Sequence, residues 1–259
     1  MTAAPLPLRR AGQGEPLVLV HGFMGGSAQW SAELAALGAH VDVIAPDLAG
    51  YGDAADRDAP ASIAAHARSV LATLDTLGIQ RFHLLGHSMG GMVVQEMVHQ
   101  APSRVQRLVL CATAAQGSIP GRFETMQRSR ERLVEEGVER VARRISATWL
   151  LDREASPAYP ALSALALRTG AQAARAGLDA MEGWDGRDRL ATIGSPTLVV
   201  WGESDRTYGW PLIEGLWRTI PGASLAVLPG CSHALHLERP ALFHALVLDF
   251  LRSPIAARG

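Results

Sequence analysis

The 259-residue sequence contains little of what marks a secreted, membrane-bound or nucleic-acid-binding protein. It has only two cysteines, Cys111 and Cys231, which we interpret as free buried thiols of a reducing compartment. No run of about 18 apolar residues is present, and residues 1–10 lack the apolar stretch of a signal peptide. A formal net charge of −1 gives no global field to attract nucleic acid or an acidic membrane. We therefore expect a cytoplasmic protein, monomeric or homodimeric, whose partner is a small-molecule substrate.

Short apolar runs alternate with longer helical patterns along most of the chain. The runs are rich in Val, Leu and Ile and show no strict polar alternation, which is typical of parallel strands covered on both faces. Strands and helices that alternate in this way predict an α/β fold with right-handed crossovers. The predicted strands are 17–20, 41–45, 82–85, 108–111, 197–201 and 224–228.

Three segments show helical patterns between these strands. Apolar residues recur every three or four positions in 63–77, with Ser62 as a suitable N-cap and Gly78 as a suitable end. A second helix is predicted over 88–100, and a third over 241–251 with a proline in its first turn.

The alternation stops between about 116 and 190, where no convincing strand is found and arginines are frequent. Helical spacing links the residues Val134, Val138, Val141, Ile145 and Trp149. We interpret this stretch as a helical insertion above the carboxyl ends of the strands, where ligands bind in such sheets. The predicted division is a core of residues 1–115 and 190–259 with an insertion of residues 116–189.

A glycine-serine motif, GHSMG at residues 86–90, follows one predicted strand and opens a helical pattern. A nucleophilic serine needs a sharp strand-to-helix turn that exposes its hydroxyl, and small neighbours that allow close backbone approach. The alternative is a glycine-rich turn with a capping serine. The strand-to-helix context favours Ser88 as a nucleophile.

Residues 21–26 (HGFMGG) form another glycine-rich segment directly after a predicted strand. It is either a simple loop or a source of backbone N–H groups for an oxyanion, in which case the donors are Phe23 and Met89. The segment lacks both the GxGxxG spacing and a Walker lysine, so we do not expect nucleotide binding.

An acid and a base follow the last two predicted strands. Asp205 comes just after strand 197–201; Glu203 is its rival, although a solvated surface position is the simpler explanation for that residue. His233 lies on the loop after strand 224–228. His236 is the alternative base, but its position is more typical of a surface or helix-edge histidine.

Together with residues 47–52 and 230–240, these motifs resemble the α/β-hydrolase superfamily over nearly the whole chain. Within it the chain is similar to small esterases and lactonases, such as the 3-oxoadipate enol-lactonases, with residues 143–149 in support. The resemblance implies a mostly parallel sheet flanked by helices, with the insertion as a helical cap. It also implies site residues, namely Ser88 as nucleophile, Asp205 as acid, His233 as base, and Phe23 and Met89 as oxyanion donors.

The activity implied is hydrolysis of a small carboxylic ester or enol-lactone through an acyl-serine intermediate. No cofactor is expected, and no metal, because the histidines show no metal-ligand spacing. Two alternatives stay open: a C–C bond hydrolase acting on a diketone, and a non-catalytic ligand receptor on the same fold. C–C hydrolases of this superfamily usually have a Gly-Pro-Gly oxyanion loop, whereas this chain has FMG at 23–25.

Large apolar side chains and cap arginines are candidates for the substrate pocket. Packing in the core or cap is the simpler explanation for the former, and a solvated helix face for the latter. A cap arginine would bind a substrate that carries an acid group. The candidates are Met24, Trp30, Met126, Arg144, Trp149 and Trp184.

Overall fold

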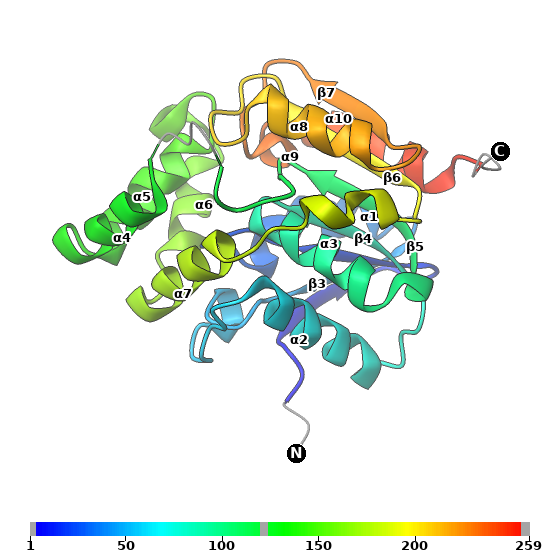
Figure 1. Ribbon diagram of the computed structural model, residues 1–259, viewed down its shortest axis with the longest axis horizontal. Coiled ribbons are helices and arrows are strands. Elements are labelled where there is room, and N and C mark those ends of the chain that lie inside the picture. Colours follow the sequence, from blue (N-terminus) through cyan, green and yellow to red (C-terminus); the bar gives the residue numbers. More distant parts are fainter. Residues whose placement is uncertain (1–3, 120–123, 255–259) are drawn as a thin grey trace.

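The computed structural model describes residues 4–119 and 124–254, which form a seven-stranded sheet in the order β1-β3-β2-β4-β5-β6-β7 (Figure 1). Only β1 is antiparallel to its neighbour, so the expected mostly parallel sheet is confirmed. The strands are β1 (Leu8–Ala11), β2 (Pro16–Val20), β3 (Asp42–Pro46), β4 (Phe82–His87), β5 (Val105–Cys111), β6 (Thr197–Gly202) and β7 (Ser224–Leu228).

Strand β1 was not predicted, because it lies at the sheet edge and lacks an apolar run. Its two arginines are exposed while its ends are half-buried. The Arg10 guanidinium donates to both carboxylate oxygens of Asp42 on β3, at 2.8 and 2.7 Å. An edge strand that pairs on one side only can therefore form from a polar sequence.

Helices cover both faces of the sheet. Successive residues of β2 belong to two different apolar clusters, as the pleat requires. Helices α2, α3 and α8 contribute to the cluster on one face, and α1 and α10 to the cluster on the other. The helices are α1 (Ser31–Leu37), α2 (Ile63–Thr76), α3 (Met89–Gln100), α4 (Met126–Glu135), α5 (Val138–Thr148), α6 (Tyr159–Ala166), α7 (Ala171–Glu182), α8 (Trp210–Thr219), α9 (Leu235–Glu238) and α10 (Pro240–Arg252).

The predicted insertion contains the four helices α4–α7, which lie to one side of the sheet (Figure 1). We call these helices the cap. An antiparallel bridge between Gln116 and Asp185 joins the two ends of the insertion. The division between core and cap at residues 116–189 stays a prediction.

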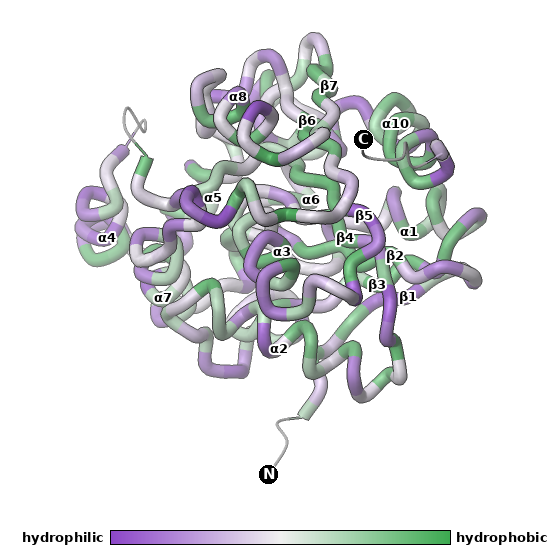
Figure 2. Tube along the Cα trace, turned by 45° about the vertical axis from the view of Figure 1, so that its right-hand side comes forward, coloured by the Kyte–Doolittle hydropathy of each residue, from purple (hydrophilic) through white to green (hydrophobic). Residues whose placement is uncertain are grey.

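One expectation about the cap was wrong. Val134 was grouped with Val138 and Ile145 on one helical stripe, but the chain turns at Gly137 with φ +80°, which separates α4 from α5. Val134 is consequently 82% exposed on α4, whereas Ile145 is buried on α5. Figure 2 shows both hydrophilic and hydrophobic segments along α4, in keeping with a surface helix.

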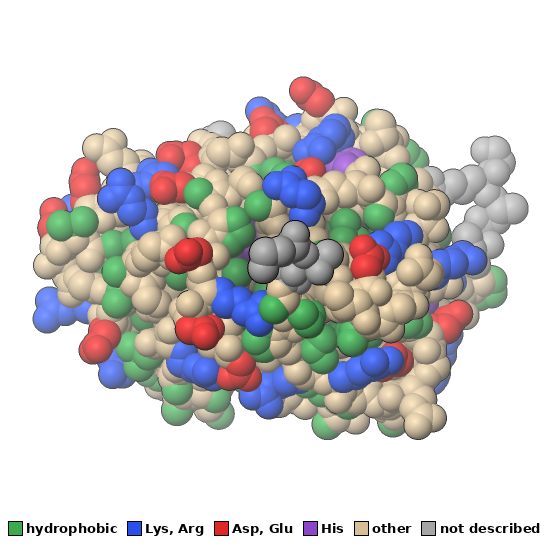
Figure 3. All heavy atoms as spheres, turned by 90° about the horizontal axis from the view of Figure 1, so that it is seen from below, with side chains coloured by type: hydrophobic (Ala, Val, Ile, Leu, Met, Phe, Trp, Pro, Cys, Tyr) green, Lys and Arg blue, Asp and Glu red, His purple; other side chains and the backbone are tan. Residues whose placement is uncertain are grey.

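Charged side chains of both signs are interspersed over the face shown in Figure 3.

Every helix within the described ranges is too short or too polar to cross a lipid bilayer. The two cysteines are free and buried, as expected.

Candidate active site

Ser88 lies at the sharp turn between β4 and α3 with φ 55° and ψ −122°. A positive φ is strained for any residue other than glycine and costs about 1–3 kcal/mol. Hydrogen bonds fix this conformation on both sides of the residue. The Ser88 N–H donates to the Cys111 carbonyl at 3.0 Å, and the Thr113 hydroxyl donates to the Ser88 carbonyl at 2.7 Å. The serine is thus held with its side chain at the carboxyl edge of the sheet.

The glycines around Ser88 are required by close backbone contacts. A Cβ atom at Gly90 would lie 2.2 Å from the Val20 carbonyl oxygen, and one at Gly86 would lie 2.3 Å from the Gly90 oxygen. No side chain fits at such distances. The GHSMG pattern therefore follows from the packing of α3 against β2 and β4.

His233 and Asp205 are joined by a buried hydrogen bond of 3.0 Å between Nδ1 and Oδ2. Because a carboxylate accepts, the Nδ1–H donates and Nε2 carries the free lone pair of the neutral ring. The other Asp205 oxygen accepts the backbone N–H groups of Thr207 and Tyr208, at 2.7 and 3.3 Å. Its rival, Glu203, is exposed and accepts the Gly230 N–H at 3.2 Å instead. The structure thus places Asp205, rather than Glu203, against the histidine.

Ser88 follows β4 and His233 follows β7, so both lie at the carboxyl edge of the sheet. They do not hydrogen-bond to each other in this structure. The His87 ring, one residue before Ser88, is 4.7 Å from the His233 ring and donates through Nε2 to the His233 carbonyl at 3.0 Å. His233 Nε2 is buried and has no protein partner within the described residues. Catalytic hydrogen bonds of free enzymes often tighten only when substrate binds.

The glycine-rich loop after β2 lies directly against Ser88. A Cβ atom on Gly22 would be 3.0 Å from the Ser88 Cβ. The His21 ring holds the loop: Nδ1–H donates to the Gly22 carbonyl at 2.8 Å, and Nε2 accepts the Leu48 N–H at 2.9 Å. Burial lowers the His21 pKa, which keeps this ring neutral.

The two candidate oxyanion donors are Phe23 on this loop and Met89 at the start of α3. In the described part of the chain, neither N–H donates to another protein group. The N-terminus of α3 adds positive dipole at this point. Two free amides therefore lie near Ser88, and their role as oxyanion donors stays a prediction.

Two small cavities meet at Ser88, and Phe23 and Trp149 line both. The larger, the cap cavity, measures about 30 Å³. It is also lined by Met126, Ile145, Met181, Thr207 and Tyr208. The smaller, the polar niche, measures about 10 Å³. It is also lined by Gln29, His87, Leu162, Ala234 and His236.

Of the predicted pocket residues, only Met126 and Trp149 line either cavity. Met24 and Trp30 are fully buried in the core. The Trp184 indole N–H donates to Glu96 at 3.3 Å, away from Ser88. These side chains pack, which was the simpler explanation offered for them.

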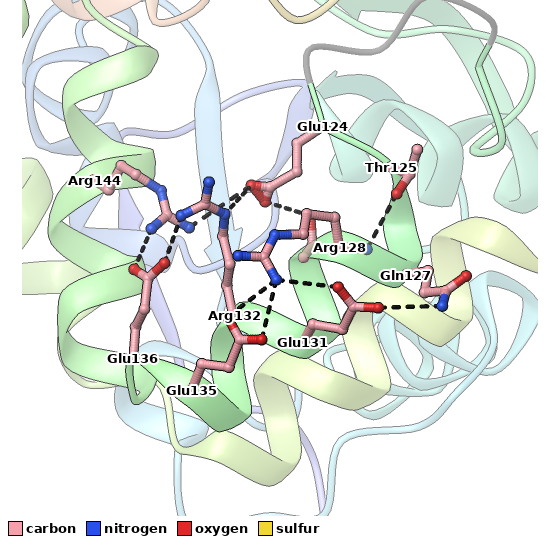
Figure 4. A network of polar contacts seen from close by, with 10 residues as sticks. Glu124, Thr125, Gln127, Arg128, Glu131, Arg132, Glu135, Glu136 and Arg144 are labelled. Atoms are coloured by element: carbon pink, nitrogen blue, oxygen red, sulfur yellow. Dashed lines mark hydrogen bonds and ion pairs between the residues drawn. The ribbon is translucent and has the colours of Figure 1, made fainter.

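Arg144 also lies outside both cavities. Its guanidinium pairs with Glu136, and with Glu124 at 3.8 Å, in a network that joins α4 to α5 (Figure 4). Arg132 contacts the same two carboxylates, at 2.5 Å for Glu136 and 3.1 Å for Glu124. Two arginines and two glutamates thus neutralise one another within the cap.

His236, expected at the surface or at a helix edge, lies on the short helix α9 but not at the surface. It is 1% exposed, and its ring packs at a tilt against two others, with centroids 4.7 Å from that of Trp30 and 4.9 Å from that of His87. Burial lowers its pKa to about 4. The short helix α9 turns this side chain inward, which a single histidine in a sequence does not reveal.

Other lining residues were not predicted. Tyr208 follows the acid by three residues, and Ile145 faces inward from α5, so strand-end position and helical periodicity are signals that point to them. Gln29 carries no such signal. Within the two described ranges no three His, Cys, Asp or Glu side chains are grouped to hold a metal ion.

Comparisons with known proteins identify relatives over almost the full length. A family model described as "alpha/beta hydrolase fold" matches residues 15–240. A protein of Pseudomonas savastanoi pv. phaseolicola, provisionally named carbamate hydrolase RutD, is 32% identical over 243 residues, 92% of this chain and 93% of its own. The 2-hydroxy-6-oxo-6-phenylhexa-2,4-dienoate hydrolase of Burkholderia cepacia is 30% identical over 94% of this chain and 90% of its own. The crystal structure of the enol-lactonase from Burkholderia xenovorans has a TM-score of 0.87 and 26% identity, over 96% of both chains.

Proposed function

Because this chain belongs to the α/β hydrolase fold family and is a hydrolase, we propose that it cleaves small carboxylic esters or lactones through an acyl intermediate on Ser88. The observation that carries the proposal is the buried hydrogen bond between His233 and Asp205, at the same sheet edge as Ser88. That bond leaves the His233 lone pair on Nε2, the atom that must accept the serine proton.

In the proposed mechanism, His233 Nε2 takes the Ser88 proton as the hydroxyl oxygen attacks the substrate carbonyl. Asp205 holds the ring orientation and stabilises the imidazolium that forms. The Phe23 and Met89 N–H groups receive the negative charge on the carbonyl oxygen. Water activated by the same histidine then cleaves the acyl-serine and restores the free enzyme.

The lining of the cap cavity supports a small substrate without a charged group. Among the described residues, those that line it carry apolar side chains or neutral hydroxyls, and none of them is an arginine. Met126 and Trp149, from the cap, are the side chains that we propose to contact the substrate. The similarity to an enol-lactonase structure favours a lactone or ester bond.

Hydrolysis of a C–C bond is the second candidate, favoured by the similarity to the Burkholderia cepacia dienoate hydrolase. A dienoate carries a carboxylate, which a binding site ordinarily pairs with a cation. Arg144, the cation foreseen for this purpose, is occupied by Glu136 and Glu124. We therefore rank ester or lactone cleavage above C–C cleavage.

Labelling with a fluorophosphonate probe tests the proposal. The probe is expected to modify Ser88 in the wild-type protein and to leave the Ser88→Ala variant unmodified. Turnover of a panel of p-nitrophenyl esters, lactones and a vinylogous diketone then separates the two reactions. Absence of labelling, or binding of ligands without turnover, would contradict the proposal and favour a receptor.

A further inference from the structure

The polar niche beside Ser88 contains polar atoms that have no partner in the described protein. These atoms are Gln29 Nε2, His87 Nδ1 and both ring nitrogens of His236. Their residues are 8%, 5% and 1% exposed, so bulk water does not reach them freely. Buried polar groups without hydrogen bonds cost free energy, and such a cluster around one cavity indicates a bound ligand.

The mixture of donors and acceptors among these atoms favours a ligand with a neutral hydroxyl group. His87 donates through Nε2 to the His233 carbonyl, so its Nδ1 is an acceptor. Gln29 Nε2 is a donor. His236, neutral because burial lowers its pKa to about 4, provides one donor and one acceptor. A group that both donates and accepts can pair with Gln29, His87 and one of the two His236 nitrogens, whereas an anion or cation leaves more of the set unmet.

The size of the niche limits the ligand to one small molecule. About 10 Å³ is near the minimum that holds a single water. Gln29 and Leu162 also line a surface cleft of about 430 Å³ between α1 and α6. Gln29 and Leu162 therefore lie between the niche and this cleft.

We infer that the polar niche holds the water that hydrolyses the acyl-Ser88 intermediate, resupplied through the Gln29–Leu162 constriction while the acyl group fills the cap cavity. The inference rests on the proposed function. The water oxygen forms the new bond to the acyl carbon as the bond from that carbon to Ser88 Oγ breaks. The water passes from the niche to His233, whose ring lies 4.7 Å from the His87 ring in the niche wall. One water proton passes to His233 and then to Ser88 Oγ, which releases the acid and the free serine. Gln29 and His236 are positioning residues for this step.

Separate measurement of acylation and deacylation tests the role of the niche. The full-length protein is mixed with p-nitrophenyl acetate; the nitrophenol burst reports acylation, and quenched mass spectra report decay of the acetyl-Ser88 adduct. We expect Gln29→Met and His236→Phe each to slow adduct decay about tenfold, the effect of one lost hydrogen bond, with the burst rate unchanged. Gln100→Met, which changes a glutamine on α3 bonded to the Ala64 carbonyl, is the matched control and should decay as the wild type does.

The outcomes distinguish the two proposals. Decay at the wild-type rate in both niche variants, or an equal fall in burst and decay, would overturn the niche assignment alone. Absence of a Ser88 adduct in the wild type would overturn the proposed function, and the role of the niche with it.

Added alcohols distinguish water from a substrate hydroxyl as the occupant of the niche. Methanol should intercept acetyl-Ser88 slowly in the wild type and propan-1-ol more slowly still, because about 10 Å³ is near the minimum that holds a single water. Leu162→Ala widens the constriction and should raise propyl ester formation severalfold relative to methyl ester. An unchanged ratio of the two esters would show that the attacking molecule arrives by another route and would overturn the inference.

Discussion

The carboxyl edge of the sheet and the cap helix α4 hold their side chains by different forces. At the sheet edge, Ser88 is fixed by buried hydrogen bonds and by glycines in close backbone contact. On α4 only Met126 and Ser129 are buried, and much of the remaining attachment is ionic. Arg130, for example, contacts Asp179 on α7 at 2.7 Å. The candidate nucleophile thus lies in the region fixed by buried hydrogen bonds, whereas Met126, which we propose to contact the substrate, lies in the region held more weakly.

The largest effect is expected from Ser88→Ala at the sheet edge. Loss of the nucleophile should lower kcat by about 10⁴-fold or more, because the histidine and acid act only through it. Steady-state hydrolysis of p-nitrophenyl acetate, with circular dichroism to establish folding, measures this. Near-normal turnover by the folded variant would remove Ser88 from the mechanism.

A matched pair of carboxylate changes tests which acid orients His233. Asp205→Asn should lower kcat by about 10³- to 10⁴-fold, since the amide no longer favours the reactive tautomer. Glu203→Gln removes an exposed acceptor of the Gly230 N–H and should leave kcat within about threefold. The reverse ranking of the two variants would assign the acid to Glu203.

Substitutions at two glycines test whether the sheet edge is packed more tightly than the cap. Gly90→Ala places a methyl group 2.2 Å from the Val20 oxygen and should lower the free energy of unfolding by about 3 kcal/mol or more. Gly137→Ala meets no neighbouring atom, and only its φ of +80° opposes the change, at about 1 kcal/mol. Urea denaturation of both variants measures the difference. Equal losses would show that the two regions are packed alike.

The smallest effect is expected from Arg144→Gln in the ion network of Figure 4. The side chain is 31% exposed, and partly exposed ion pairs contribute at most about 1 kcal/mol to stability. The loss should shrink further in 1 M salt, and KM for a neutral ester should not change. A large rise in KM for a substrate that carries a carboxylate would instead restore Arg144 as a binding residue.

The sequence was sufficient to predict the parallel strands and the approximate ends of α2, α3 and α10, because these elements bury continuous or periodic apolar residues. It also placed candidate nucleophile, acid and base after three separate strands. Strand β1 was missed because its two arginines interrupt the apolar pattern of a strand. Its pairing with β3 involves Asp42, which lies 32 residues after Arg10 in the sequence.

The walls of the two cavities were harder to predict than the strand ends. Gln29 and Leu162 come together only when the cap folds back over the loop after β2. The inward position of His236 depends on packing against Trp30, far away in the sequence. Arg144 resembled a substrate-binding residue because its partners, Glu124 and Glu136, become neighbours only through the packing of α4 against α5.

The coupling between Asp205 and His233 tests the central claim most directly. Asp205→Asn is introduced into the wild type and into His233→Ala, and kcat for p-nitrophenyl acetate is measured for all four proteins. If the carboxylate acts only through the imidazole, Asp205→Asn should cost about 10³-fold or more in the wild type and less than about threefold without the histidine. An equal loss in both backgrounds would contradict the account.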